Sequence, residues 1–294
     1  MLSKTILSVV VVGVFTMPVR AQTIWHVDDD APLGGDGTTW STAYKYLQDA
    51  LAAATNGDEI RVAGGTYKPD QDEAGNVTLG ERIETFQLIS GVELYGGYAG
   101  LTNPSDPNAR DIETHETVFS GDLGTLGDSS DNAYHVVTGS ETDHTAVRDG
   151  FRITEGNANG GGLNNHGGGM HNDAGNPTLS NCRFTGNSAY HYGGGMYNNT
   201  SSPALANCAF AENSSSYGKG GGMHNDNGSS PTVNNCTFSG NSTSSPGTGG
   251  AGMSNYNGSD PTLDNCTFEG NEAHLLSLSS TGGGMSNPFS TVAF

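Results

Sequence analysis

Positive charge is scarce in this chain. Its 294 residues include 11 Lys and Arg against 31 Asp and Glu, so the formal net charge is −20 at pH 7. A surface this acidic excludes nucleic acid and anionic lipid as favoured partners, because both are bound mainly through Lys and Arg. It also disfavours polyanionic sugars, unless calcium bridges the two acidic surfaces. Solvation is the simplest role for the acidic side chains, since a charged coat limits aggregation.

Long hydrophobic runs are lacking too, except near the N-terminus. Residues 5–17 form an apolar segment after Lys4, and Val19-Arg20-Ala21 follows. A short basic start, an apolar core of ~13 residues and small residues before the cut are typical of a secretory signal peptide. The run is shorter than the ~20 residues of a transmembrane helix. We predict cleavage after Ala21 and a mature protein of net charge −22, secreted or at the cell surface, with no transmembrane segment.

Glycine is abundant, with 45 residues, and much of it lies in repeats. A Gly-Gly-Gly-Met block or a close variant occupies residues 167–170, 193–196, 220–223, 250–253 and 282–285. Between these blocks, an 11-residue unit that starts with Pro and ends with Phe-x-x-Asn occupies residues 177–187, 203–213, 231–241 and 261–271. Self-similarity at a period of 20–50 residues indicates a solenoid. The gap from the Asn to the next Met grows from 9 to 14 residues, which places lengthening loops on one side. We expect any functional surface beside those loops.

Within one repeat the apolar residues alternate as in strands. Leu179, Cys182 and Phe184 are the apolar positions, and Asn181 stands where the alternation shifts. Asn tolerates the left-handed backbone of a corner. Such short strands bury their apolar side only when coils stack ~4.8 Å apart. The predicted fold is all-β, a single-stranded right-handed parallel β-helix with an N-terminal capping helix.

The four cysteines occupy equivalent positions in the repeats. Cys182, Cys208, Cys236 and Cys266 are 26, 28 and 30 residues apart. Side chains at equivalent positions project in parallel, whereas a disulfide requires a near-perpendicular torsion. We predict an interior ladder of free thiols. No Cys-x-x-Cys pair is present, so zinc is not expected.

The Phe-x-x-Asn units resemble the repeats of polymorphic outer membrane proteins, although those families carry Gly-Gly-Ala-Ile where this chain has Gly-Gly-Gly-Met. More broadly, the chain resembles secreted bacterial right-handed β-helix proteins of the pectin-lyase-like superfamily. This resemblance covers nearly all of the mature chain and implies the fold. It implies little about activity.

Before the repeats, residues 22–57 are predicted to form an N-terminal strand and a capping helix. Residues 24–27 read as the strand, and the apolar spacing over residues 42–54 predicts the helix. Asp28, Asp29 and Asp30 lie between them. They lack the spacing of a calcium loop, so a solvated turn is the first interpretation and a calcium site the alternative.

Residues 58–159 are predicted to form irregular early coils with loop insertions, and residues 160–294 the regular coils. The first coil strand is expected over residues 60–67, and seven to nine coils in all. After Met285 no capping helix is recognisable, so we expect either a reading frame that is truncated at its C-terminal end or a last coil that docks against another surface, with truncation the first interpretation.

One tight acid–base grouping exists in the coil region, namely Arg148, Asp149 and Arg152. The alternation around Phe151 predicts both arginines on the outside of a coil. A polysaccharide lyase needs calcium-binding carboxylates and a basic residue, and a hydrolase needs paired carboxylates. No such constellation is complete in the sequence, so we assign no catalytic, cofactor-binding or metal-binding residues.

Histidines and asparagines gather around the glycine blocks. His171 and His224 follow two of the blocks, but Tyr197 stands between them in the series, so a metal site is not expected there. Asparagines recur one position later and predict a hydrogen-bonded amide ladder. They are Asn172, Asn198, Asn225, Asn255 and Asn287.

Two functions are compatible with this sequence. The first is a secreted, non-catalytic β-helix with a structural, adhesive or glycan-contacting role, whose partner is an extracellular polysaccharide or a cell-surface component. The alternative is a calcium-dependent polysaccharide lyase or a glycoside hydrolase, which depends on fold analogy.

Overall fold

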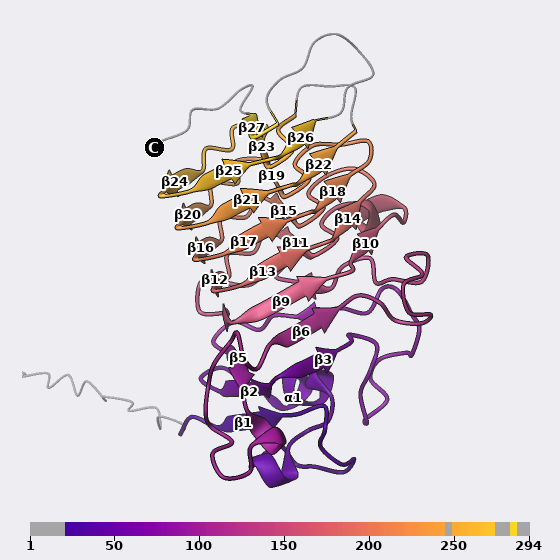
Figure 1. Cartoon of the computed structure of the whole chain (residues 1–294), viewed down its shortest axis with the longest axis vertical. Helices are drawn as coiled ribbons and strands as arrows, with labels where there is room; N and C mark the ends of the chain where they lie inside the picture. Colours follow the sequence, from indigo (N-terminus) through magenta and orange to yellow (C-terminus); the bar gives the residue numbers. More distant parts are fainter. Residues whose placement is uncertain (1–20, 245–248, 274–282, 287–294) are drawn as a thin grey trace, which may run out of the picture.

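The computed structural model describes residues 21–244, 249–273 and 283–286, and in it the chain winds into a solenoid of about seven turns (Figure 1). All the paired strands run parallel, and they form four sheets along the solenoid. The all-β parallel β-helix expected from the sequence is therefore confirmed. In the described residues no helix has both the length and the apolar composition that a bilayer crossing requires.

The later coils pass through the four sheets in turn, whereas the early coils contribute no strand to the third sheet, which begins at residue 157. The first sheet contains β1 (Ile24–Val27), β2 (Glu59–Ala63), β5 (Glu93–Tyr98), β8 (Val147–Asp149), β12 (Thr178–Ser180), β16 (Ala204–Ala206), β20 (Thr232–Asn234) and β24 (Thr262–Asp264). The second contains β3 (Gly65–Tyr67), β6 (Thr117–Ser120), β9 (Phe151–Thr154), β13 (Arg183–Thr185), β17 (Ala209–Ala211), β21 (Thr237–Ser239) and β25 (Thr267–Glu269). The third contains β10 (Asn157–Ala158), β14 (Ser188–Ala189), β18 (Ser214–Ser215), β22 (Ser242–Thr243) and β26 (Glu272–Ala273). The fourth contains β4 (Phe86–Gln87), β7 (Val137–Thr138), β11 (Met170–Asp173), β15 (Met196–Asn199), β19 (Met223–Asp226), β23 (Met253–Asn255) and β27 (Met285–Ser286).

The interior consists of columns of equivalent side chains. The phenylalanine column stacks ring on ring, with centroids 4.7, 4.8 and 4.7 Å apart from Phe184 through Phe210 and Phe238 to Phe268. Leucine or valine and methionine form parallel columns in the same core. Cys182, Cys208 and Cys236 are buried as free thiols and Cys266 is partly buried, so the predicted interior position of the cysteine ladder is confirmed.

The corners between strands depend on Asn and Gly. Asn181 and its equivalents Asn207, Asn235 and Asn265 all have φ between 49° and 54°, as the sequence predicts for the corner position. In three of the glycine blocks the first residue has φ between 63° and 69°, for example Gly193. At the second position a Cβ atom on Gly194 would collide with the carbonyl oxygen of Ser214 on the next coil.

Two amide ladders run inside the β-helix. The predicted ladder is confirmed from Asn172 to Asn255, where each Nδ2 donates to the next Oδ1 over 2.7 to 2.8 Å; Asn287 lies outside the described residues. A second ladder, which the sequence reading missed, is made by the Asn of Phe-x-x-Asn. The Asn213 Oδ1 accepts from the N–H and the Nδ2 of Asn187, and the Asn213 Nδ2 donates to the Phe184 carbonyl.

The N-terminal part differs from its prediction in detail. The helix expected over residues 42–54 is shorter: α1 spans Leu47–Ala53, preceded by a 3₁₀ turn at Trp40–Thr42. Tyr44 instead pairs with Val27, which extends the first sheet's edge and delays the helix. Leu47, Ala50 and Leu51 turn into the core, where α1 packs against β1 and β4. The single strand expected over residues 60–67 is two strands, β2 and β3, because the chain turns a corner at Gly64.

Candidate functional site

An aromatic cluster lies where the chain passes from the third sheet to the fourth. His171, Tyr197 and His224 share one register position on β11, β15 and β19 and point outward, yet all three are buried. Loop residues cover these three side chains. The His166 ring stacks on Tyr197 at 4.8 Å, and the Tyr192 ring stacks on His224 at 4.5 Å. We call the buried and covering rings together the aromatic cluster; its members are His135, His166, His171, Tyr192, Tyr197 and His224.

Burial keeps the histidines of this cluster uncharged. Desolvation lowers the pKa of His135, His166 and His171 to about 4, and that of His224 to about 3. The ring centroids of His135 and His171 lie 4.9 Å apart, a pair that the sequence did not suggest. Among the described residues, the metal-ligating groups that converge are three aspartates, and no histidine of the cluster belongs to such a group.

Two tyrosines extend the aromatic cluster to the surface. Tyr190 and Tyr217 follow β14 and β18, are 43% and 61% exposed, and place their ring centroids 4.7 Å apart. The backbone N–H of Tyr217 donates to the Tyr190 carbonyl, so the two positions are held on adjacent coils. His191 contacts Tyr190 edge-on and lies 5.7 Å from His166, which connects this tyrosine pair to the buried rings. The sequence indicated the loop side but singled out neither tyrosine.

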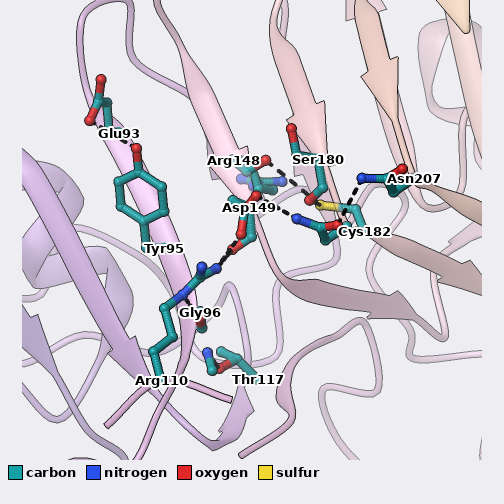
Figure 2. A network of polar contacts seen from close by, with 12 residues as sticks. Glu93, Tyr95, Gly96, Arg110, Thr117, Arg148, Asp149, Ser180, Cys182 and Asn207 are labelled. Carbon is teal, nitrogen blue, oxygen red and sulfur yellow. Dashed lines mark hydrogen bonds and ion pairs between the residues drawn. The ribbon is translucent and has the colours of Figure 1, made fainter. Parts of the chain in front are cut away.

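The acid–base grouping of the sequence is dispersed by the fold. Arg148 was expected on the outside of a coil, and this is wrong: its side chain is fully buried inside the β-helix. Asp149 points outward, where it accepts from Arg110 (Figure 2). It also accepts from the Asn181 amide. Arg152 lies outside as predicted, with its Nε 3.3 Å from a carboxylate oxygen of Glu116. These residues therefore do not converge on one reacting point.

A polar groove crosses the outer face of the second sheet. It has a volume of about 220 Å³ and includes Lys68, Ser120, Asp122, Arg152 and Glu155 in its lining. Asp122 is buried; one carboxylate oxygen accepts from the Gly127 N–H, and the other has no partner among the described residues. Ser120 donates to Glu155. Only Arg152 of this set was considered from the sequence, because Lys68, Asp122 and Glu155 belong to three different coils and are far apart in the chain.

The aspartates at positions 28–30 are structural. A turn is present at Asp29 and Asp30, and Asp30 is exposed, but Asp28 is 1% exposed, so the interpretation as a solvated turn is wrong for Asp28. Its carboxylate accepts the N–H groups of Asp30 and Leu101, and Asp29 accepts that of Thr66. Burial raises the pKa of both Asp28 and Asp29. Their oxygens lie within 4.8 Å of one another and of Asp30, so they could approach one cation. The backbone donors explain the arrangement without a cation.

One family of known proteins matches the repeats of this chain. No curated protein and no solved structure matches the chain. A family model for the right-handed β-helix region matches residues 130–290, which is more than half of the chain and includes the regular coils up to residue 290. The chain therefore belongs to the right-handed β-helix family.

Proposed function

We propose that this protein is an exported, non-catalytic β-helix that binds extracellular polysaccharide through the tyrosine pair. The exposed rings of Tyr190 and Tyr217, tilted by 38° with their centroids 4.7 Å apart, carry the proposal. The carbon-bound hydrogens of a pyranose ring pack well on the face of an aromatic ring. Because the pair is backed by the aromatic cluster, its rings lose little freedom on binding, which favours affinity.

The net charge of the chain limits the class of polysaccharide that it would bind. With 31 acidic and 11 basic residues, the protein repels polyuronates and sulfated sugars unless a divalent cation intervenes. A neutral polysaccharide is therefore the favoured class.

The test compares wild type with Tyr190→Ala/Tyr217→Ala on neutral and acidic polysaccharides, by affinity electrophoresis or a pull-down on insoluble polymer. We expect wild type to bind a neutral polymer and the double variant to lose at least about tenfold in affinity, typical of losing two stacking contacts. Leu79→Ala is the matched control, since Leu79 is 75% exposed and distant in the chain. Equal binding by the double variant and wild type would contradict the proposal.

Export is tested separately. Residues 1–20 lie outside the described part, and cleavage after Ala21 stays a prediction. Expression with the native leader in a bacterial host, followed by intact-mass analysis of the extracytoplasmic fraction, should give a chain that begins at Gln22. A chain of full mass retained in the cytoplasm would argue against export.

The groove on the second sheet supports the alternative, a polysaccharide lyase or hydrolase. Lys68 and the partly unpartnered carboxylate of Asp122 are its reactive groups. The enzyme alternative is tested by incubating the protein with a polyuronate panel plus calcium and monitoring unsaturated products and reducing ends. Turnover that is lost in Lys68→Ala or Asp122→Asn would favour the enzyme and displace the non-catalytic proposal.

A further inference from the structure

The tyrosine pair connects two adjacent coils at the surface of the solenoid. Tyr190 follows β14 and Tyr217 follows β18, and their ring centroids lie 4.7 Å apart with the ring planes tilted by 38°. The two strands pair in register, and the Tyr217 N–H donates to the Tyr190 carbonyl oxygen over 2.8 Å. The fold therefore holds in contact two phenol rings that are one whole coil apart in the sequence.

Both rings of the tyrosine pair are open to solvent. Tyr190 is 43% exposed and Tyr217 is 61% exposed, so a dissolved reagent reaches each ring and a phenolic proton leaves directly into water. Tyr192 and Tyr197 also face each other, but their centroids are 6.3 Å apart and Tyr197 is 7% exposed. Burial raises the pKa of Tyr197 to about 13, so its phenol gives up a proton reluctantly. The exposed pair is therefore the better placed of the two for phenol chemistry.

We propose that Tyr190 and Tyr217 form an oxidative modification site, at which a one-electron oxidant couples the two rings into a dityrosine cross-link. Each phenol gives one electron to the oxidant and its hydroxyl proton to water, which leaves two phenoxyl radicals. One carbon–carbon bond forms between the ring carbons ortho to the oxygens, and the hydrogens of those carbons move to the oxygens as the rings regain aromaticity. The pair thus loses two electrons and two protons, as many as hydrogen peroxide takes up when a haem peroxidase reduces it to water.

Fixed proximity favours this coupling over its competitors. Two groups that the fold holds in contact react as if at a very high effective concentration, so the second radical meets its partner in the same chain first. The readily oxidised tryptophans, Trp25 and Trp40, lie with β1 at the opposite end of the solenoid from β18 (Figure 1), and the thiols of Cys182 and Cys208 are buried. A covalent bond between adjacent coils restricts the unfolded chain, so the cross-link would also stabilise the solenoid.

The unaltered chain provides the first test. Dilute native protein is photo-oxidised with a ruthenium tris-bipyridyl complex and persulfate, which generate tyrosyl radicals. Cleavage after Arg183, Glu212 and Lys219 then places Tyr190 in segment 184–212 and Tyr217 in segment 213–219. We expect mass spectrometry to find the two segments joined, with two hydrogen atoms missing, and the yield to fall at least about tenfold when the protein is oxidised in denaturant. Segments that stay separate, or an equal yield in denaturant, would overturn the proposal.

Phenylalanine substitutions assign the cross-link to its residues. Tyr217→Phe keeps the ring but removes the phenol, and it should lower the yield of joined segments at least about tenfold. Tyr192→Phe is the matched control, since Tyr192 belongs to the same segment as Tyr190, and it should leave the yield unchanged. An undiminished yield in Tyr217→Phe, or an equal loss in Tyr192→Phe, would refute the assignment.

The cross-link does not rest on the binding of polysaccharide. Because Tyr217→Phe retains the aromatic face, this variant should still bind the polymer while it fails to cross-link. Failure of the cross-link and failure of the proposed function are therefore distinguished by the same protein.

Discussion

At the scale of single residues, the aromatic cluster makes stability depend on pH. Its four histidines, two of them buried and two partly buried, have pKa values of about 3 to 4, below the ordinary value of 6.5. A lowered pKa in the folded state means that the unfolded chain binds more protons between these values. Their contribution is therefore complete above about pH 6.5 and is lost as the pH falls towards 4. Acid should loosen the cluster and, with it, the support of the tyrosine pair.

We expect the free energy of unfolding to fall between pH 6.5 and 4, and the fall to be smaller in His224→Ser. Each buried histidine contributes a slope of about 1.4 kcal/mol per pH unit. Ser is chosen because Ser254 occupies the equivalent position on the next coil. Denaturant unfolding at several pH values measures the slope, and exposed His144→Gln is the control. An unchanged slope in His224→Ser would show that His224 does not stay neutral in the folded protein.

The burial of Arg148 shows where residue-level reading of the sequence fails. Arg148 aligns with Leu179, Gly150 with the corner residue Asn181, and Phe151 with Cys182. Gly150 has φ +82°, so the corner falls there and reverses the alternation that had placed Arg148 outside. The sequence does carry evidence of this corner, since Gly150 stands at the position that Asn occupies in the regular repeats. The charge of Arg148 obscures this evidence, because inward-facing positions are recognised in a sequence by their hydrophobic residues.

At the scale of strands and corners, the amide ladder of Phe-x-x-Asn ties each coil to its neighbours. Asn213 is 0% exposed and accepts two hydrogen bonds from Asn187, while its own N–H and Nδ2 both donate to Asn241. A backbone corner thus satisfies its polar groups through side chains of the coils on either side. The corner needs Asn specifically, since one amide both accepts and donates.

Asn213→Ala should therefore be costly. It removes the acceptor for two buried donors of Asn187 and the donor for the Phe184 carbonyl. Because an unsatisfied buried group costs about 1–3 kcal/mol, we expect at least about 3 kcal/mol of lost stability. Asn207→Gly, at an exposed corner with φ 54°, should change stability by less than about 1 kcal/mol. Chemical denaturation of both variants measures the difference. Similar losses in the two would contradict the ladder's importance.

At the scale of the whole molecule, the regular coils could be predicted because translation along one axis repeats the same contacts. The Leu, Cys, Phe and Met columns follow directly from the repeat spacing. The early coils were harder to predict from the sequence, as the shortened helix α1 and the split into β2 and β3 demonstrate. The polar groove could not be predicted, because it joins Lys68, Asp122 and Glu155 across coils of unequal length. No spacing rule relates such residues.

Because of the two amide ladders, one whole turn of this chain could be deleted while the remaining turns keep their contacts. Each regular coil presents the same amide, ring and thioether to the next coil, so the two coils brought together by removing one turn match each other. Deleting residues 182–207 would join Asn181 to Cys208 and leave each column one member shorter. We expect this shortened chain to fold with a parallel-sheet circular dichroism spectrum and a cooperative transition. Deleting residues 182–194 instead, half a turn, should prevent folding, because inward and outward side chains would exchange places.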